Sequence, residues 1–247
     1  KDVLDATRSN RFTYQESNLE GYMQYAQQWK RLQASAGLRI EYMQTVGTLK
    51  SYQDGTVMEE NKNCHTRFFP NLSVSYDLDN SSKLTLAYSK RQDKPRYEDL
   101  NPFEYLLDEL TYWKGNPFIQ PQTSHRISLD YTMKKLSISL SYNQLDNYFT
   151  QLPDAYKNDC IVMTTKNIGL QKQLTLDLIY NRRLTSWWDF STNIGIYYFV
   201  NHLDYETYRE DYRRPSCNLS LSSDIQLPAK LRMELATRYA TKRQGRS

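Results

Sequence analysis

The residue types that most often carry catalysis or metal binding are few and scattered in this sequence. Its three histidines, His65, His125 and His202, are far apart, and none has a partner at the spacing of a metal site. The motifs Gly-x-Ser-x-Gly and His-Glu-x-x-His do not occur, and with only 8 glycines a phosphate-binding loop is not expected. We therefore predict no catalytic residue, no metal ligand and no cofactor.

Cysteines and charges exclude two further classes of protein. Cys64, Cys160 and Cys217 are widely spaced and form no Cys-x-x-Cys pair, so neither a disulfide scaffold nor a zinc ribbon organises the chain. The net charge is only +4, and basic residues are usually neighboured by acidic ones, as in KRQDKPRYED. Because nucleic-acid-binding domains concentrate their basic residues, we expect no nucleic-acid partner.

The side chains best suited to ligand recognition are aromatic. Tyr105, Tyr112 and Trp113 lie in a long, proline-rich connection at residues 91–124. Proline restricts φ, so such a connection is stiff without ladder partners. Loops often carry binding residues, which makes these three side chains candidate ligand contacts, but aromatic residues also fold loops, and we favour a cap over the barrel mouth in which they pack together. Within this connection, residues 104–111 favour a short helix.

The elements that must position these residues are β-strands. Residues 126–143 read RISLDYTMKKLSISLSYN, in which apolar side chains alternate with polar ones on both sides of Lys134 and Lys135. A period of two predicts a β-hairpin with one apolar and one polar face. Such strands suit a soluble sandwich, whose apolar face covers a core, or a transmembrane barrel, whose apolar face contacts lipid and whose polar face contacts a hydrated lumen.

The same period recurs along the chain and predicts ten strands. The expected strands are 12–28, 34–42, 72–78, 84–88, 127–133, 136–142, 160–180, 188–198, 217–224 and 231–239. Short turns are expected near residues 30, 80, 134, 184 and 228, and long connections at 50–66, 91–124, 150–160 and 201–212. Because short turns on one side and long loops on the other are the plan of an outer-membrane barrel, we predict an all-β fold, an antiparallel up-and-down transmembrane β-barrel segment with short periplasmic turns and long extracellular loops.

Composition is compatible with crossing a membrane by strands. No run approaches the roughly 20 apolar residues of a spanning helix, and the mean hydropathy is −0.78. Only about every second residue of a barrel strand faces lipid, so this value does not argue against a barrel. The sequence contains 21 tyrosines, which suit strands, polar rims and membrane interfaces.

Charged residues fall on the polar side of the expected strands. The candidates for a lumen lining are Arg39, Glu41, Asp130, Asp177, Asp224, Arg232 and Glu234. In a soluble sandwich the same residues would form the solvated surface. Because Arg39 and Glu41, like Arg232 and Glu234, are two residues apart on one face, they could form ion pairs with neighbouring strands.

The proline-rich connection resembles a segment of TonB-dependent receptor-like outer-membrane proteins of the Bacteroidetes type. In these proteins a strand is followed by Pro-x-Tyr-x-x-Leu-Asn-Pro-Phe and then by Gly-Asn-Pro-x-Leu-x-Pro. The matching residues are Pro95, Tyr97, Leu100, Asn101, Pro102, Phe103, Gly115, Asn116, Pro117 and Pro121, with Ile119 in place of the leucine. The stretches 37–42 and 166–169 are also similar to parts of such barrels.

The resemblance implies a Gram-negative outer-membrane barrel of about 22 strands filled by an N-terminal plug. We therefore expect residues 1–247 to form a partial outer-membrane β-barrel domain without the plug. The implied partners are outer-membrane lipid, the plug and a TonB-type energy-coupling system. The implied function is uptake of a small-molecule, glycan or peptide ligand, with the 91–124 loop facing that ligand.

Two alternatives stay open at this point. The first is an outer-membrane barrel enzyme, a protease or lipase, with carboxylates and a histidine such as His125 or His202 at its mouth. The second is a soluble β-sandwich binding domain, which requires the alternating leucines and tyrosines to be buried between two sheets.

Overall fold

The fold consists almost entirely of long β-strands. The computed structural model describes residues 10–51, 56–157, 160–205, 208–228 and 231–241. In these ranges the elements are β1 Asn10–Trp29, β2 Leu32–Ser51, β3 Val57–Asp77, β4 Ser82–Asp93, α1 Tyr97–Leu100, β5 Glu104–Asp108, β6 Thr111–Lys114, β7 Gln122–Met133, β8 Leu136–Lys157, β9 Cys160–Thr185, β10 Trp188–Tyr205, β11 Tyr208–Gln226 and β12 Arg232–Ala240. Across the described residues, no helix is long and apolar enough to cross a membrane.

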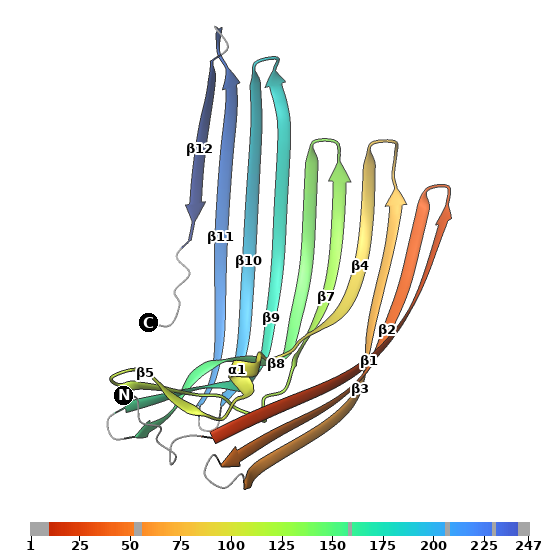
Figure 1. Ribbon diagram of the computed structural model, residues 1–247. Helices are drawn as coiled ribbons and strands as arrows, with labels where there is room; N and C mark the ends of the chain where they lie inside the picture. Colours follow the sequence, from red (N-terminus) through yellow and green to blue (C-terminus); the bar gives the residue numbers. More distant parts are fainter. Residues whose placement is uncertain (1–9, 52–55, 158–159, 206–207, 229–230, 242–247) are drawn as a thin grey trace.

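The strands form one curved antiparallel sheet in up-and-down order (Figure 1). Its path runs β1-β2-β3-β4-β7-β8-β9-β10-β11-β12, so each strand pairs with its neighbours in sequence apart from the detour through β5 and β6. The ten predicted strands are confirmed as this path. Short turns join the strands at one end of the sheet, and α1 and β5 lie near the other end (Figure 1).

The prediction of a long connection is wrong for three of the four segments. The segments 50–66, 150–160 and 201–212 mostly continue the flanking strands, since β2 reaches Ser51 and β3 begins at Val57, while β8 ends at Lys157 and β9 begins at Cys160. β10 and β11 likewise pair up to Tyr205 and Tyr208. Backbone hydrogen bonds hold a ladder together whatever side chains it carries, so the strands persist where the apolar alternation ends.

The helix predicted for residues 104–111 is also wrong. This run forms β5 and turns into β6, with Tyr105 paired to Trp113. The turn is closed by Asp108, whose Oδ1 accepts a hydrogen bond from the backbone N–H of Leu110 at 2.9 Å. β6 then pairs in parallel with β9. Because this pairing is with a strand remote in sequence, the local helix propensity does not decide the structure. The short helix α1 lies earlier, in the Pro-x-Tyr-x-x-Leu motif.

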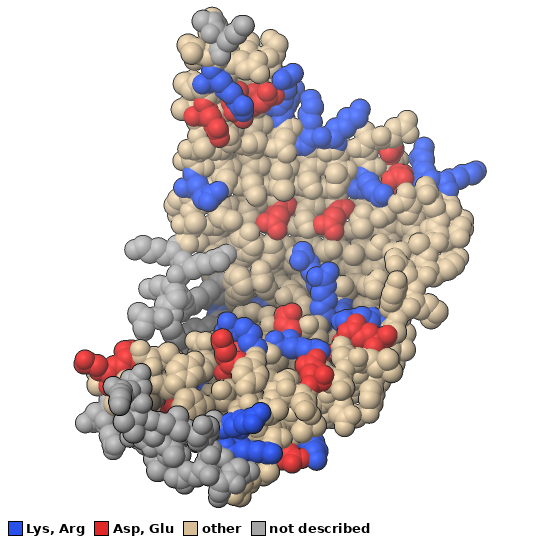
Figure 2. All heavy atoms as spheres, viewed as in Figure 1, with Lys and Arg blue, Asp and Glu red and all other residues tan. Residues whose placement is uncertain are grey.

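The two faces of the sheet differ as the alternation predicts. One face, here called the outward face, presents apolar side chains such as Ile127, Leu140 and Leu176, which are 48, 42 and 39% exposed. The opposite, inward face carries α1 (Figure 1) and charged residues of both signs (Figure 2). These leucines are exposed rather than buried between two sheets, which contradicts the sandwich alternative. The buried apolar residues lie mainly where the 94–121 segment covers the inward face: Met43, Leu100, Trp113, Ile119, Val162 and Ile168.

Candidate functional site

The connection between β4 and β7, residues 94–121, is folded onto the inward face by a buried carboxylate. Asp99 in α1 is 4% exposed, and its Oδ1 accepts a hydrogen bond from the hydroxyl of Thr165 in β9 at 3.1 Å. Its Oδ2 accepts from the backbone N–H of Arg96 at 3.2 Å. The same carboxylate therefore caps the short helix and attaches it to a distant strand.

The Gly-Asn-Pro part of the motif continues this attachment. The backbone N–H of Asn116 donates to the Asp99 carbonyl at 2.6 Å, and the Asn116 side chain donates to the Thr165 carbonyl at 3.2 Å. A Cβ on Gly115 would lie 2.3 Å from the backbone oxygen of Asn101, so only glycine fits between these two turns. The residues that carry the family resemblance thus have a structural role, which is to hold the 94–121 segment in place.

A second stretch with a family resemblance, residues 166–169, contacts the end of the same segment. Asn167 in β9 accepts a hydrogen bond from the Gln120 N–H at 2.8 Å, and its side-chain amide donates to the Gln120 and Asn147 carbonyls at 2.9 and 2.8 Å. Ile168 beside it is 3% exposed. Residues 166–169 and the end of the 94–121 segment, which are far apart in sequence, are therefore hydrogen-bonded to each other.

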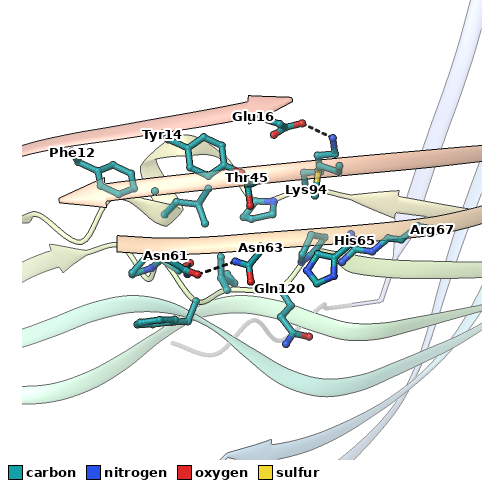
Figure 3. A pocket seen from close by; sticks show the side chains of 18 residues that line it. Phe12, Tyr14, Glu16, Thr45, Asn61, Asn63, His65, Arg67, Lys94 and Gln120 are labelled. Atoms are coloured by element: carbon teal, nitrogen blue, oxygen red, sulfur yellow. Dashed lines mark hydrogen bonds and ion pairs between the residues drawn. The ribbon is translucent and has the colours of Figure 1, made fainter. Parts of the chain in front are cut away.

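A cavity of about 360 Å³ lies between the anchored segment and the inward face of β1, β2 and β3 (Figure 3). Its lining combines amides and hydroxyls with aromatic and aliphatic groups. The lining residues are Phe12, Tyr14, Glu16, Met43, Thr45, Gly47, Asn61, Asn63, His65, Arg67, Lys94, Pro95, Leu100, Pro117, Phe118, Ile119, Gln120 and Pro121. A concave site with converging polar groups on an apolar lining is suited to a small polar ligand.

A network of ion pairs forms one wall of this cavity. The Lys94 ammonium lies 2.6 Å from Oε1 of Glu16 and 3.1 Å from Oε1 of Glu41. Partial burial lowers the pKa of Lys94, but hydrogen bonds to the two carboxylates outweigh it and raise that pKa above its usual value. The Glu41 side chain is 5% exposed and also lies 3.6 Å from Arg39. Lys94 thus stays charged and compensates a buried carboxylate.

Arg67 supplies a second cation to the cavity. It pairs in register with Glu41 across the β2–β3 ladder. Its Nη1 atom is buried and has no hydrogen-bond partner among the described residues. Asn63, four residues earlier on the same face, donates to Asn61 at 3.0 Å, and Asn61 donates to the Pro117 carbonyl at 3.0 Å. The cavity therefore offers one unsatisfied guanidinium donor beside amides that are already hydrogen-bonded.

The three aromatic candidates do not line this cavity. Tyr105 in β5 is 40% exposed, and Tyr112 in β6 is half-buried. Trp113 is 6% exposed, and its indole nitrogen has no hydrogen-bond partner among the described residues. As a ligand contact, Trp113 would need to become accessible, whereas Tyr105 already is.

The seven predicted lumen charges share the inward face. The register places all seven at alternate positions on one face, and most of them lie opposite polar or charged residues: Arg39, Glu41, Asp130, Asp177, Asp224, Arg232 and Glu234. Arg39 is the exception, because it lies opposite Tyr22 and Phe69. Arg39 pairs across strands with Glu20 at 3.1 Å, and Arg232 with Asp224 at 2.7 Å. Asp130 accepts from Ser128 at 2.9 Å, and Asp177 accepts from Tyr197 at 3.3 Å.

The sequence did not predict the cavity because many of its lining residues lie in segments expected to be loops. Asn61, Asn63 and His65 belong to the polar run that was expected to be the 50–66 connection. No alternation of apolar and polar side chains marks this run as a strand, so the sequence carries no signal that could have found them. Across the described residues, no group of three or more His, Cys, Asp or Glu is placed to hold a metal ion.

The histidines named for the enzyme alternative do not meet at a common site. His125 is in β7 and His202 is in β10, and the strands β8 and β9 lie between them in the sheet. The ring of His125 contacts Tyr88 and Asp146, with Nδ1 3.0 Å from the Tyr88 hydroxyl. It is His65 that lines the cavity.

A single up-and-down sheet with an apolar outward face and a polar, charged inward face defines a β-barrel protein of the outer membrane. Comparison with known families agrees with this class. The model of the "Outer membrane protein beta-barrel family" matches residues 1–247. The chain belongs to this family, and its location is the cell outer membrane. No curated protein matches its sequence.

The solved structures with a similar fold include two siderophore receptors and a copper transporter. The siderophore receptor PirA from Pseudomonas aeruginosa is 13% identical, with a TM-score of 0.60, and the match covers 93% of this chain and 49% of that one. The siderophore receptor PiuA from Acinetobacter baumannii is 12% identical, with a TM-score of 0.57, and the match covers 93% of this chain and 34% of that one. The copper transporter OprC is 13% identical, with a TM-score of 0.59, and the match covers 83% of this chain and 32% of that one. The chain thus spans less than half the length of these proteins, and the likeness shows the fold.

Proposed function

We propose that this protein is an outer-membrane receptor that takes up a small ligand, which binds first in the cavity between the 94–121 segment and β1 to β3. The observation that carries the proposal is the anchoring of this segment inside the curve of the sheet, where it forms a polar and aromatic site beside the inward face. Tyr105 and Tyr112 are further candidate contacts, at the β5–β6 hairpin of the same segment.

The inward charges fit a hydrated passage. A row of carboxylates and guanidinium groups is costly in contact with lipid but is stable against water or against the plug that the family resemblance implies. In this proposal Asp130, Asp177 and Asp224 face that interior. Uptake would draw on a TonB-type energy-coupling system, because an outer-membrane passage closed by a plug needs work from the inner membrane.

Ligand depletion tests the proposal. Cells that express the protein are incubated with a mixture of ferric siderophores, oligosaccharides and short peptides, with and without a protonophore, and the medium is analysed by mass spectrometry. We expect one compound class to be depleted, only by expressing cells and only with an intact proton gradient. Absence of energy-dependent depletion of any class would overturn the uptake role.

Cavity variants separate the site from the function. Phe118→Ala and Asn63→Ala remove an aromatic and an amide group from the lining, and we expect each to reduce depletion about tenfold. Leu107→Ala is the matched control, because Leu107 is 54% exposed and outside the lining. Unchanged depletion by the cavity variants would leave uptake intact but refute the cavity as the binding site.

A further inference from the structure

On the outward face, the apolar band of β4 to β10 is bordered by a tyrosine-rich row at the side of the 94–121 segment. In register across five strands this row is Tyr88, Ile127, Tyr142, Leu174 and Tyr198. Below it, toward the short turns, the outward positions are apolar, as in Leu86, Leu129, Leu140 and Leu176. Tyrosine is enriched where a membrane meets water, so this row marks the edge of the lipid-facing band.

The next outward row, one step beyond the tyrosines, is basic. Lys90 pairs with His125, His125 with Gln144, and Gln144 with Lys172, on the adjacent strands β4, β7, β8 and β9. Each residue lies two positions from a member of the tyrosine row, so all four point to the outward face. With neighbouring strands about 4.8 Å apart, the two lysine Cα atoms are roughly 14 Å apart.

The acidic residue beside this row is already occupied. Asp146 accepts a hydrogen bond from the Gln144 amide at 2.9 Å and lies 3.5 Å from Nε2 of His125. His125 is fixed from its other side by the Tyr88 hydroxyl. Within the described part of the chain, no ion pair is formed by Lys90 or by Lys172. Their ammonium groups are therefore available on both sides of a fixed polar centre.

We propose that Lys90 and Lys172, with Gln144 between them, form a binding site for the phosphate groups of an outer-leaflet glycolipid, while His125 keeps this row in place. The row lies at the end of the sheet that carries the long 94–121 connection, and in outer-membrane barrels the longer loops are extracellular. It lies just beyond the apolar band, which is the level of the lipid head groups. Ammonium groups attract phosphate as point charges, and Gln144 adds an uncharged donor.

Binding of lipopolysaccharide to the protein extracted from outer membranes in detergent tests this site. We expect the double variant Lys90→Gln/Lys172→Gln to bind it roughly tenfold or more weakly, because each lysine near a membrane surface adds appreciably to the attraction of anionic head groups. The matched control is Lys134→Gln/Lys135→Gln, which removes the same charge at the opposite end of β7 and β8.

Three further measurements make the outcome decisive. Lys90→Arg/Lys172→Arg should keep most of the binding, because the charges remain. Lipopolysaccharide stripped of its phosphates should bind the unaltered protein as weakly as the double variant binds the intact lipid. Heat-modifiable gel migration checks that each variant is folded. Equal binding by the two double glutamine variants, or undiminished binding of the dephosphorylated lipid, would overturn the proposal.

Discussion

The carboxylate of Asp99 accepts a hydrogen bond from the hydroxyl of Thr165 at 3.1 Å, although the two residues are 66 positions apart in the chain. Both residues are buried, at 4 and 2% exposure. The bond joins the short helix of the β4–β7 connection to a central strand of the sheet. It fixes the segment that forms the candidate ligand site.

Removal of this carboxylate should release the segment and leave the sheet folded. Asp99→Ala leaves the buried Thr165 hydroxyl and the Arg96 N–H without their acceptor, and such a loss costs about 1–3 kcal/mol. We expect proteolytic cleavage within residues 94–121 under conditions where the unaltered protein is intact. Glu98→Ala, at the exposed neighbouring position of α1, is the control. Equal resistance of the two variants would show that the Asp99 contact does not hold the segment.

Gly115 should be irreplaceable and Gly21 dispensable. Gly115→Ala places a Cβ against the backbone oxygen of Asn101, which cannot move without breaking the turn, and such overpacking costs typically about 1–3 kcal/mol. Gly21→Ala meets no atom within 4 Å, so its effect should stay within about 0.5 kcal/mol. Hydrogen exchange of the 94–121 amides measures the first effect. Denaturant unfolding in detergent measures both, and a loss of stability in Gly21→Ala would contradict the comparison.

A charged side chain introduced on the outward face should destabilise the fold more than one introduced on the inward face. Arg in place of Leu140 would lie in lipid, at a cost of roughly 2–4 kcal/mol near the middle of the bilayer. Arg in place of Ser139, one residue earlier, would point to the inward face, where Ser139 donates a hydrogen bond to Asp130 at 2.5 Å. Unfolding of the two variants in lipid bilayers compares the costs. Similar, small losses would count against lipid contact on the outward face.

The carboxyl group of Asp79, in the turn between β3 and β4, should titrate at an unusually low pH. Hydrogen bonds from the Ser81 hydroxyl and backbone N–H stabilise the charged carboxylate and lower the pKa of Asp79 from 3.8 to about 2. Because the pKa of Asp79 is lower in the folded than in the unfolded protein, its carboxylate stabilises the fold at pH values above the unfolded pKa of 3.8. This stabilisation is lost as the pH falls through the folded pKa of about 2. Carbon NMR of the Asp79 carboxyl follows the titration. Ser81→Ala should move its midpoint upward, and an unchanged midpoint would assign the shift to another cause.

The alternation of side chains by itself determined the strands and their faces. Residues such as Ile127 and Leu129 against Ser128 and Asp130 leave only an extended backbone with one apolar side. Because the period of two also fixes which side chains point the same way, the shared face of the charged residues followed directly. The choice between a sandwich and a barrel needed the regular order of the connections and, finally, the single sheet.

Only the tertiary structure decided where the strands stop and what the long connection does. The outer parts of β2 and β3 are held by backbone hydrogen bonds, which leave no mark in side-chain type. Residues 104–111 form β5 and begin a hairpin because β6 finds a partner in β9, a contact that local propensity does not contain. The cavity depends on the same long-range contacts. Its residues come from four stretches of the chain, and long-range bonds such as those of Asp99 and Asn167 bring them together.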